Sequence, residues 1–208
     1  MARQARSAET RAAILSAAER IFAKTGLAGA RTEAIAVEAG VNKALLYYYF
    51  RSKQRLYEAV VEDHFREFNR QAMEVLHAPG RASDILLRYV NLHFDFISAR
   101  HRHAPLFQQL LMAGGKPLER LVRLYIVPRS AALHELLARG MHEGDFREID
   151  PFHTAISIAA LIVFYFSAAK VLRLFGHSDP FSEAHLEFRK HEVLEFIRHA
   201  LFLESRSA

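Results

Sequence analysis

The chain has 208 residues, with no cysteine or tryptophan, and its 28 Lys and Arg against 23 Asp and Glu give a formal net charge of +5. The lack of cysteine excludes a disulfide framework, cysteine-ligated zinc and thiol catalysis. A composition of 51% hydrophobic and 25% charged residues is that of an ordinary folded protein and excludes global disorder.

The positive charge is concentrated in the first quarter of the chain. Residues 1–57 hold ten Lys and Arg against four Asp and Glu, whereas residues 58–208 hold eighteen against nineteen. A basic segment joined to a nearly neutral body indicates that this segment alone contacts a polyanion, either a nucleic acid or a membrane.

A membrane partner is not expected. The longest apolar run without a charge, Thr154–Ala169, has 16 residues, and a membrane span needs about 20. We therefore expect a buried helix there. The N-terminal residues lack the apolar segment of a signal peptide, so we expect a soluble protein of the cytoplasm.

Apolar residues recur at helical spacing, and no segment shows the alternation of a strand. In the first half of the chain, the expected helices are Glu9–Lys24 with Gly26 just past its end, Thr32–Ala39, Lys43–Phe50, one that begins near Lys53 and ends before Pro79, Ser83–Ala99 and Pro105–Met112.

Three helices are expected in the second half of the chain. One spans Pro117–Arg139 and is kinked at Pro128. The two final helices, over about 151–175 and 180–203, begin at Asp150-Pro151 and Asp179-Pro180, where Asp caps the helix and Pro takes its first position. The predicted fold class is all-α, with about nine helices in total.

The segment Thr32–Phe50 predicts a helix-turn-helix motif. Gly40 supplies the backbone angles of the turn, and Asn42 is placed to cap the second helix. Helical spacing puts Leu46, Tyr49 and Phe50 on an inward face of this helix and Ala44, Leu45, Tyr47 and Tyr48 on an outward one, with Lys43 at the margin.

The outward face suits a DNA major groove. Ala44 permits close approach, Leu45 can contact thymine methyl groups, and a tyrosine hydroxyl can bond a base or a phosphate. Lys53, at the start of the next helix, is placed to bind phosphate. Taken alone, however, the run of three tyrosines is also consistent with an aromatic packing cluster.

The combination of these residues resembles the TetR/AcrR family of transcriptional regulators. The resemblance covers roughly residues 8–60 and rests on the following residues: Thr10-Arg11, Ile14-Leu15, Ala17-Ala18, Phe22, Gly26, Thr32, Ile35-Ala36, Ala39-Gly40-Val41, Leu46-Tyr47, Tyr49-Phe50, Ser52-Lys53 and Leu56. It implies a three-helix DNA-binding domain followed by a helical domain that binds a ligand and dimerises.

The resemblance also implies roles for individual residues. Thr32, Lys43, Tyr47 and Lys53 would contact phosphates, and Ala44, Leu45 and Tyr48 would face base edges. Asn42 completes the expected DNA-binding set, although it stands where Ser or Thr is common in the family, and Ala44-Leu45 replaces the usual Gly and small residue. The expected phosphate-facing basic patch comprises Arg3, Arg6, Lys43, Arg51, Lys53 and Arg55.

We expect three parts along the chain: a flexible basic arm over residues 1–6, a DNA-binding domain over 7–67 and a ligand-binding and dimerisation domain over 68–208. Fourteen of the sixteen Phe lie after residue 57. Aromatic residues at helical spacing are typical of a packed core, but a helical bundle also encloses pockets. The resemblance implies a pocket, for which the candidate lining residues are His64, Phe68, His93, Phe96, Phe107, Leu111, Tyr125 and Phe164.

The resemblance further implies that the last two helices pair with their copies in a second subunit. The expected interface residues are Ile158, Leu161, Ile162, Tyr165, Leu186, Val193, Ile197 and Leu201. The alternative is that these side chains are buried within one chain. A two-fold dimer would present one recognition helix to each half of a palindromic DNA site.

These observations predict a homodimeric DNA-binding regulator, most simply a repressor, that a small and mainly apolar effector releases from its operator. No motif of a hydrolase, nucleotide-binding loop or metalloprotease is present, and no cofactor or metal is expected. Two alternatives remain open: a DNA-binding regulator that needs no ligand, and a helical small-molecule carrier or enzyme.

Overall fold

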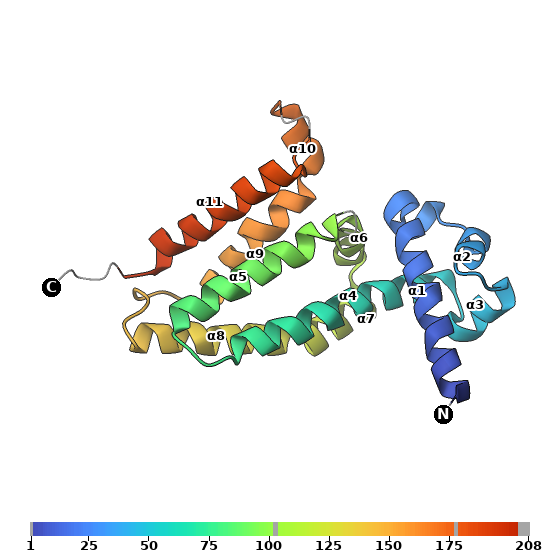
Figure 1. Ribbon diagram of the computed structural model, residues 1–208, viewed down its shortest axis with the longest axis horizontal. Helices are drawn as coiled ribbons and strands as arrows, with labels where there is room; N and C mark the ends of the chain where they lie inside the picture. Colours follow the sequence, from blue (N-terminus) through green and yellow to red (C-terminus); the bar gives the residue numbers. More distant parts are fainter. Residues whose placement is uncertain (1, 102–103, 177–178, 204–208) are drawn as a thin grey trace. The chain divides into compact units, whose positions relative to one another are not determined.

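The computed structural model describes the backbone of residues 2–101, 104–176 and 179–203 (Figure 1). Within these ranges every regular element is a helix, and the only bridge of β type joins Phe146 to Phe202. The predicted all-α fold class is confirmed. The chain divides into two compact units, one of residues 1–66 with 102–121 and one of residues 67–101 with 122–208.

The first unit holds the predicted helix-turn-helix. It comprises α1 (Ala2–Gly29), α2 (Thr32–Glu38), α3 (Lys43–Phe50), the first part of α4 (Lys53–Leu76), α6 (Ala104–Ala113) and α7 (Gly115–Leu121). Its core is formed by apolar side chains that are at most 2% exposed, among them Ile14, Phe22, Ile35, Leu46, Leu56 and Tyr57. Phe22 and Tyr57 meet edge to face, with ring centroids 5.3 Å apart.

The second unit is a bundle around α5 (Ala82–Ser98). Besides the last part of α4, it contains the π-helical segment η2 (Val122–Ile126), α8 (Val127–His142), α9 (Pro151–Ser167), α10 (Ala169–Leu174) and α11 (Glu183–Leu201). Helix α5 packs against α8, α9 and α11 (Figure 1). Ile85, Leu86 and Ile162 are completely buried between them.

The start of the chain differs from the prediction. Residues 2–6 belong to α1, so the helix predicted from Glu9 begins at Ala2. Ala, Arg and Gln are strong helix formers, and the Thr10 hydroxyl donates to the Arg6 carbonyl at 2.8 Å. The predicted end of this helix at Gly26 is confirmed as a kink, where Gly26 adopts φ 68°. The side chain of Arg3 lies outside the described residues.

Two of the nine expected helices are divided. The helix predicted over Pro117–Arg139 becomes α7, η2 and α8, because Pro128 lacks an N–H and stands in the first turn of α8. The helix predicted over 151–175 is interrupted at Ala168, which has non-helical backbone angles. The domain boundary predicted at 67/68 lies next to the unit boundary at 66/67, but residues 102–121 group with the first unit.

The two predicted Asp-Pro helix starts have different outcomes. The Asp150 carboxylate accepts a hydrogen bond from the His153 N–H at 2.7 Å, and Pro151 is the first residue of α9, as predicted. The prediction for Asp179 is wrong, because its carboxylate accepts from Phe181 N–H within a turn, and α11 begins only at Glu183.

The described helices are too short or too polar to cross a bilayer. None of those drawn in Figure 1 has the combination of length and apolar character that a membrane span requires. The apolar run Thr154–Ala169 lies mostly on α9, whose residues Ile158, Ile162 and Phe166 are buried in the second unit.

Gly140 of α8 provides a test of this packing. A Cβ atom at this position would lie 2.2 Å from the Phe146 ring and 3.0 Å from the Ala82 methyl group. Because the Phe146 ring is 2% exposed and has little room to move, we expect Gly140→Ala to lower the free energy of unfolding by about 2 kcal/mol or more. Urea denaturation followed by circular dichroism measures this change.

The matched control is Ala138→Ser, an exposed position of the same helix. We expect this control to change the free energy of unfolding by less than about 0.5 kcal/mol. A Gly140→Ala variant as stable as the control would show that Phe146 does not pack against α8 as described.

Candidate nucleic-acid interface

Local chemistry explains why residues 32–50 form two helices with a tight turn. Gly40 has φ +66°, a conformation that costs a side chain energy, and the Val41 N–H bonds to the Ala36 carbonyl at 2.9 Å. The Asn42 carboxamide oxygen accepts from the Leu45 N–H at 2.7 Å. The predicted N-cap of α3 is therefore confirmed.

Helix α3 has a buried and an exposed side. Leu46 and Phe50 are at most 5% exposed, whereas the Tyr48 side chain is 68% exposed and Ala44 is also exposed. Leu45 is half-buried and so belongs only partly to the outward face on which it was expected. The first unit thus presents small, apolar and phenolic groups along one side of its recognition helix.

A surface hollow of about 530 Å³ lies beside this helix. Its lining residues come from the α1–α2 connection, α2, α3 and α4, and they are Ala28, Gly29, Ala30, Arg31, Thr32, Glu33, Tyr47 and Lys53. Three of the four residues expected to contact phosphate, Thr32, Tyr47 and Lys53, are thereby brought together. We name this surface the Lys53 hollow.

Hydrogen bonds position the polar groups of the Lys53 hollow. The hydroxyl oxygens of Thr32 and Tyr47 are 3.4 Å apart. The Lys53 ammonium donates to the carbonyl oxygens of Ala30 and Ala28, at 3.0 and 3.3 Å. Because neither of these acceptors carries a formal charge, the Lys53 cation is not neutralised by the contacts that hold it in place.

Lys43 is engaged differently from Lys53. Its ammonium forms an ion pair with the Glu33 carboxylate and lies 5.9 Å from the centre of the Tyr47 ring. The hydrogen bond from Lys43 is the largest cause that lowers the pKa of Glu33, and the same bond raises the pKa of Lys43. Both side chains are exposed, so the pair adds little to stability, but it occupies the lysine.

Sequence reasoning missed two residues of this surface. Glu33 enters it through the ion pair with Lys43, ten positions away in the sequence, and no local pattern indicates that contact. Arg31 lines the Lys53 hollow and is exposed. Its position directly before Thr32 was the available signal.

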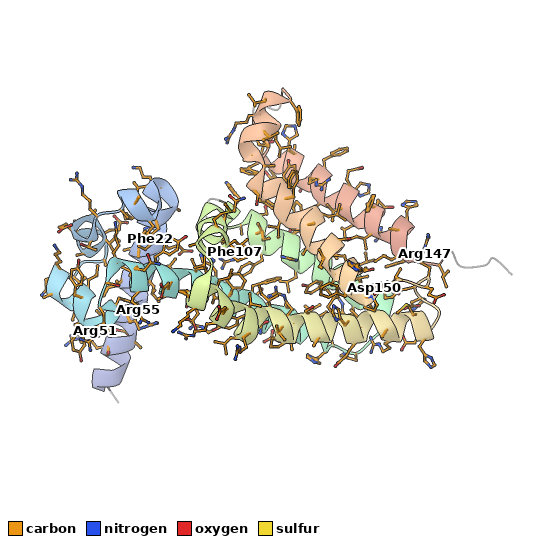
Figure 2. All side chains as sticks on the ribbon, turned by 180° about the vertical axis from the view of Figure 1, so that it is seen from behind. Phe22, Arg51, Arg55, Phe107, Arg147 and Asp150 are labelled. Carbon is orange, nitrogen blue, oxygen red and sulfur yellow. The ribbon has the colours of Figure 1, made fainter. Side chains whose placement is uncertain are left out.

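Further basic side chains lie on the same unit. Arg51, at the end of α3, has a positive φ of 64°, and both Arg51 and Arg55 are exposed. Figure 2 shows them on the side of the unit formed by α3 and the start of α4. Arg6 is also exposed. These residues add positive charge to the surface that carries the outward face of α3.

The candidate pocket residues are only partly brought together. In the second unit, the Phe68 ring lies 4.6 Å from the His93 ring and 5.1 Å from the Phe96 ring. Tyr125 lies in η2. His64 and Phe107 belong to the first unit, where His64 Nε2 is 2.7 Å from a Glu19 carboxylate oxygen and Phe107 stacks near Phe65.

Two of the candidate pocket residues lie at the surface of the single chain. Leu111 and Phe164 are 45% and 70% exposed. Phe164 lies on the outer side of α9, opposite the buried Ile162 side.

Most of the predicted interface residues lie in the interior of the single chain. Five of the eight are at most 7% exposed within a single chain, namely Ile158, Ile162, Val193, Ile197 and Leu201. Leu161, Tyr165 and Leu186 are half-buried, and the Tyr165 hydroxyl donates to the Pro180 carbonyl at 2.6 Å. The apolar periodicity of α9 and α11 therefore marks the core of the second unit rather than its surface.

Models of known families match both parts of the chain. The family described as bacterial regulatory proteins of the tetR family matches residues 14–60, and a tetracyclin repressor-like C-terminal domain matches residues 83–197. The transcriptional regulator RutR of Escherichia coli strain K12 is 33% identical over 159 residues, which are 71% of this chain and 69% of RutR.

The transcriptional repressor NicS of Pseudomonas putida is 28% identical over 169 residues, which are 80% of each chain. Solved structures agree in fold. A transcriptional regulator from Saccharomonospora viridis in complex with choline gives a TM-score of 0.77 at 21% identity and covers 95% of this chain and 100% of its own. FadR from Bacillus subtilis with stearoyl-CoA gives 0.71 at 20% identity, with 89% and 96% covered.

The family matches cover the helix-turn-helix with its Lys53 hollow as well as the helical body. The relatives are transcriptional regulators and not enzymes. This chain therefore belongs to the TetR/AcrR family of transcriptional regulators, and its first unit carries the family's DNA-binding helix-turn-helix.

Proposed function

We propose that the protein is a cytoplasmic, homodimeric repressor that binds a palindromic operator and is released from it by a small-molecule effector. The observation that carries this proposal is the Lys53 hollow, which gathers Thr32, Tyr47 and Lys53 beside the exposed face of α3. The repressor NicS, at 28% identity, supports the sign of regulation.

In this proposal the Lys53 hollow receives a phosphate of the DNA backbone. The Lys53 ammonium exchanges its uncharged carbonyl acceptors for the anionic phosphate oxygen, a stronger acceptor. The hydroxyl groups of Thr32 and Tyr47 supply neutral hydrogen bonds from the same surface. Phosphate contacts of this kind fix the register of the helix, while Ala44, Leu45 and Tyr48 read the base edges.

Lys43 has a conditional role in DNA binding. In the free protein its charge is balanced by Glu33, so a phosphate contact requires Lys43 to exchange partners. Asn42 caps α3 and acts on the DNA mainly through the position of that helix. The net charge that drives association therefore comes chiefly from Lys53 and the exposed arginines around it.

A dimer interface is supported by exposed apolar residues on α9 and α11. Phe152, Ile156 and Phe164 are 55%, 51% and 70% exposed on α9, and Phe188 and Phe196 are 66% and 60% exposed on α11. Spacings of four and eight residues place them on one side of each helix. Because the two helices contact each other, we infer that these five side chains form one apolar face, which we name the α9–α11 face.

The α9–α11 face is best covered by the same face of a second copy. An isologous contact matches each apolar side chain with its equivalent under two-fold symmetry. The two recognition helices of such a dimer read successive turns of the major groove, about 34 Å apart. This arrangement requires an operator with two-fold symmetry.

Release by an effector requires an element that connects the ligand and the DNA surface. Helix α4 begins with Lys53 of the Lys53 hollow and continues to Phe68 of the second unit. We propose that the effector binds better to a dimer whose recognition helices are wrongly spaced for the operator, so that its binding shifts the population away from the DNA-bound state.

The phosphate contact is tested by Lys53→Ala. We expect the variant to bind all duplexes more weakly, whatever their sequence, and to lower the dependence of log K on log salt by about 1 for each subunit. Fluorescence anisotropy over a range of NaCl concentrations measures both effects, on an operator first selected from random duplexes.

The matched control for this experiment is Lys24→Ala, which removes the same charge from an exposed position of α1 outside the Lys53 hollow. Equal losses of affinity in the two variants would show that Lys53 acts only through its general positive charge and not through a phosphate contact. Both variants must keep the fold, as measured by circular dichroism, and the dimer, as measured by light scattering.

The dimer interface is tested by Phe196→Glu. Because Phe196 is 60% exposed in one chain, the variant is expected to fold normally but to sediment as a monomer and to lose operator affinity at least tenfold. Val127→Glu, at a 54% exposed position of α8, is the matched control and is expected to remain dimeric. A dimeric Phe196→Glu protein would contradict the proposed interface.

A further inference from the structure

Five side chains of the second unit form a cluster of unusual composition. Phe68 of α4, Tyr89, His93 and Phe96 of α5, and Arg129 of α8 meet around the Phe68 ring. The His93 ring and the Arg129 guanidinium carbon lie 4.6 and 4.7 Å from the centre of this ring. Phe96 lies 5.1 Å and Tyr89 6.5 Å from it. We name this group the Arg129 cluster.

Three members of the Arg129 cluster are buried, and Phe96 and Arg129 are half-buried. Phe68, Tyr89 and His93 are 6%, 4% and 6% exposed. Burial raises the pKa of the Tyr89 phenol, and the nearby Arg129 opposes this rise. The Arg129 guanidinium thus lies against the face of the Phe68 ring and close to the Tyr89 phenol.

Two polar atoms of the Arg129 cluster have no hydrogen-bond partner among the described residues. They are Nδ1 of His93 and Nη1 of Arg129, and both are inaccessible at the surface. A buried donor or acceptor left without a partner costs about 1–3 kcal/mol, and more for a charged group. Buried polar groups in native proteins are nearly always bonded, so two such atoms against one ring indicate a ligand.

The charge of the cluster defines the ligand it would accept. Burial, with a smaller contribution from Arg129, lowers the pKa of His93 to about 3, so the imidazole is neutral near pH 7. The half-buried Arg100 also lies at the cluster, 4.2 Å from the centre of the Phe96 ring, and the cation with a buried, unpartnered nitrogen is Arg129. Among the described residues, no carboxylate forms an ion pair with it. The guanidinium therefore lacks the anionic partner that a buried charge normally has.

We propose that the Arg129 cluster is the effector site and that the effector is a small aromatic carboxylate. A carboxylate matches the planar fork of a guanidinium, and its negative charge balances the Arg129 cation, for which no ion pair is described. The rings of Phe68 and Phe96 supply an apolar surface for a planar ligand. A carboxylate effector replaces the mainly apolar effector that the sequence predicts. This inference rests on the proposed function.

The experiment compares acids with their neutral amides. Isothermal titration calorimetry is performed on the full-length protein without DNA, with benzoate, 4-hydroxybenzoate and phenylacetate as probes and with the corresponding amides. We expect at least one acid to bind at least tenfold more tightly than its amide. We expect Arg129→Met to abolish this preference, and Arg123→Met, at an exposed arginine of η2, to retain it.

A second measurement separates a ligand-binding role of Arg129 from a structural one. A residue kept for packing destabilises the protein when it is replaced, whereas replacing a cation that lacks an anionic partner by an apolar residue of similar volume removes an uncompensated desolvation cost. We expect the ligand-free Arg129→Met protein to melt at the same temperature as the unmodified protein or higher. A clear decrease assigns Arg129 to packing and overturns the proposal.

The remaining outcomes are equally decisive. Failure of all three acids to bind better than their amides overturns the acid site, and an equal preference in Arg129→Met does the same. Anisotropy with operator DNA then tests the proposed function separately. Binding of an acid without release of DNA retains the site but contradicts effector-controlled repression. If only a neutral compound releases the operator DNA, effector-controlled repression is supported and the acid site is overturned.

Discussion

Helix α4 is the element on which the account of this protein depends, because both units use it. Its first half contributes Leu56 and Tyr57 to the core of the first unit, and its second half contributes Phe68 and Ala72 to the core of the second. An unbroken ladder of backbone hydrogen bonds connects the two halves. A ligand that contacts Phe68 and a phosphate that contacts Lys53 would therefore act on the same helix.

Fewer basic side chains are free of a negatively charged partner than the composition indicates. The sequence shows an excess of basic residues in the first 57 positions, but the side chains are not equivalent. Glu33 already neutralises Lys43, whereas Lys53 is held by uncharged carbonyl groups beside the Thr32 and Tyr47 hydroxyls. Physical context thus distinguishes two lysines that the sequence ranks alike as phosphate contacts.

Features that depend on neighbouring residues were predicted well from the sequence. The Asn42 cap, the Gly26 break and the start of α9 at Asp150-Pro151 each follow from a side chain or backbone preference within a few positions. Features that depend on the packing of distant segments were not. Apolar periodicity does not show whether a side of a helix is buried or exposed in the folded chain: Ile162 and Ile197 are at most 2% exposed, whereas Phe164 and Phe196 are 70% and 60% exposed.

The candidate ligand site shows the same limit of sequence reasoning. Phe68, His93 and Phe96 were selected as aromatic or histidine residues of the body, but Arg129 was not, because its position against the Phe68 ring depends on how α8 packs. The unpartnered His93 and Arg129 atoms become visible only in three dimensions. These two atoms change the expected effector from an apolar compound to an acid.

The central claim is that effector and operator compete through the protein, and thermodynamic linkage tests it most directly. Calorimetric titration of the tightest-binding acid into the free protein and into the operator complex gives its two dissociation constants. We expect the operator to weaken acid binding by at least tenfold, and the acid to weaken operator binding by the same factor. Equal affinity of the acid for the free and the operator-bound protein would contradict this claim.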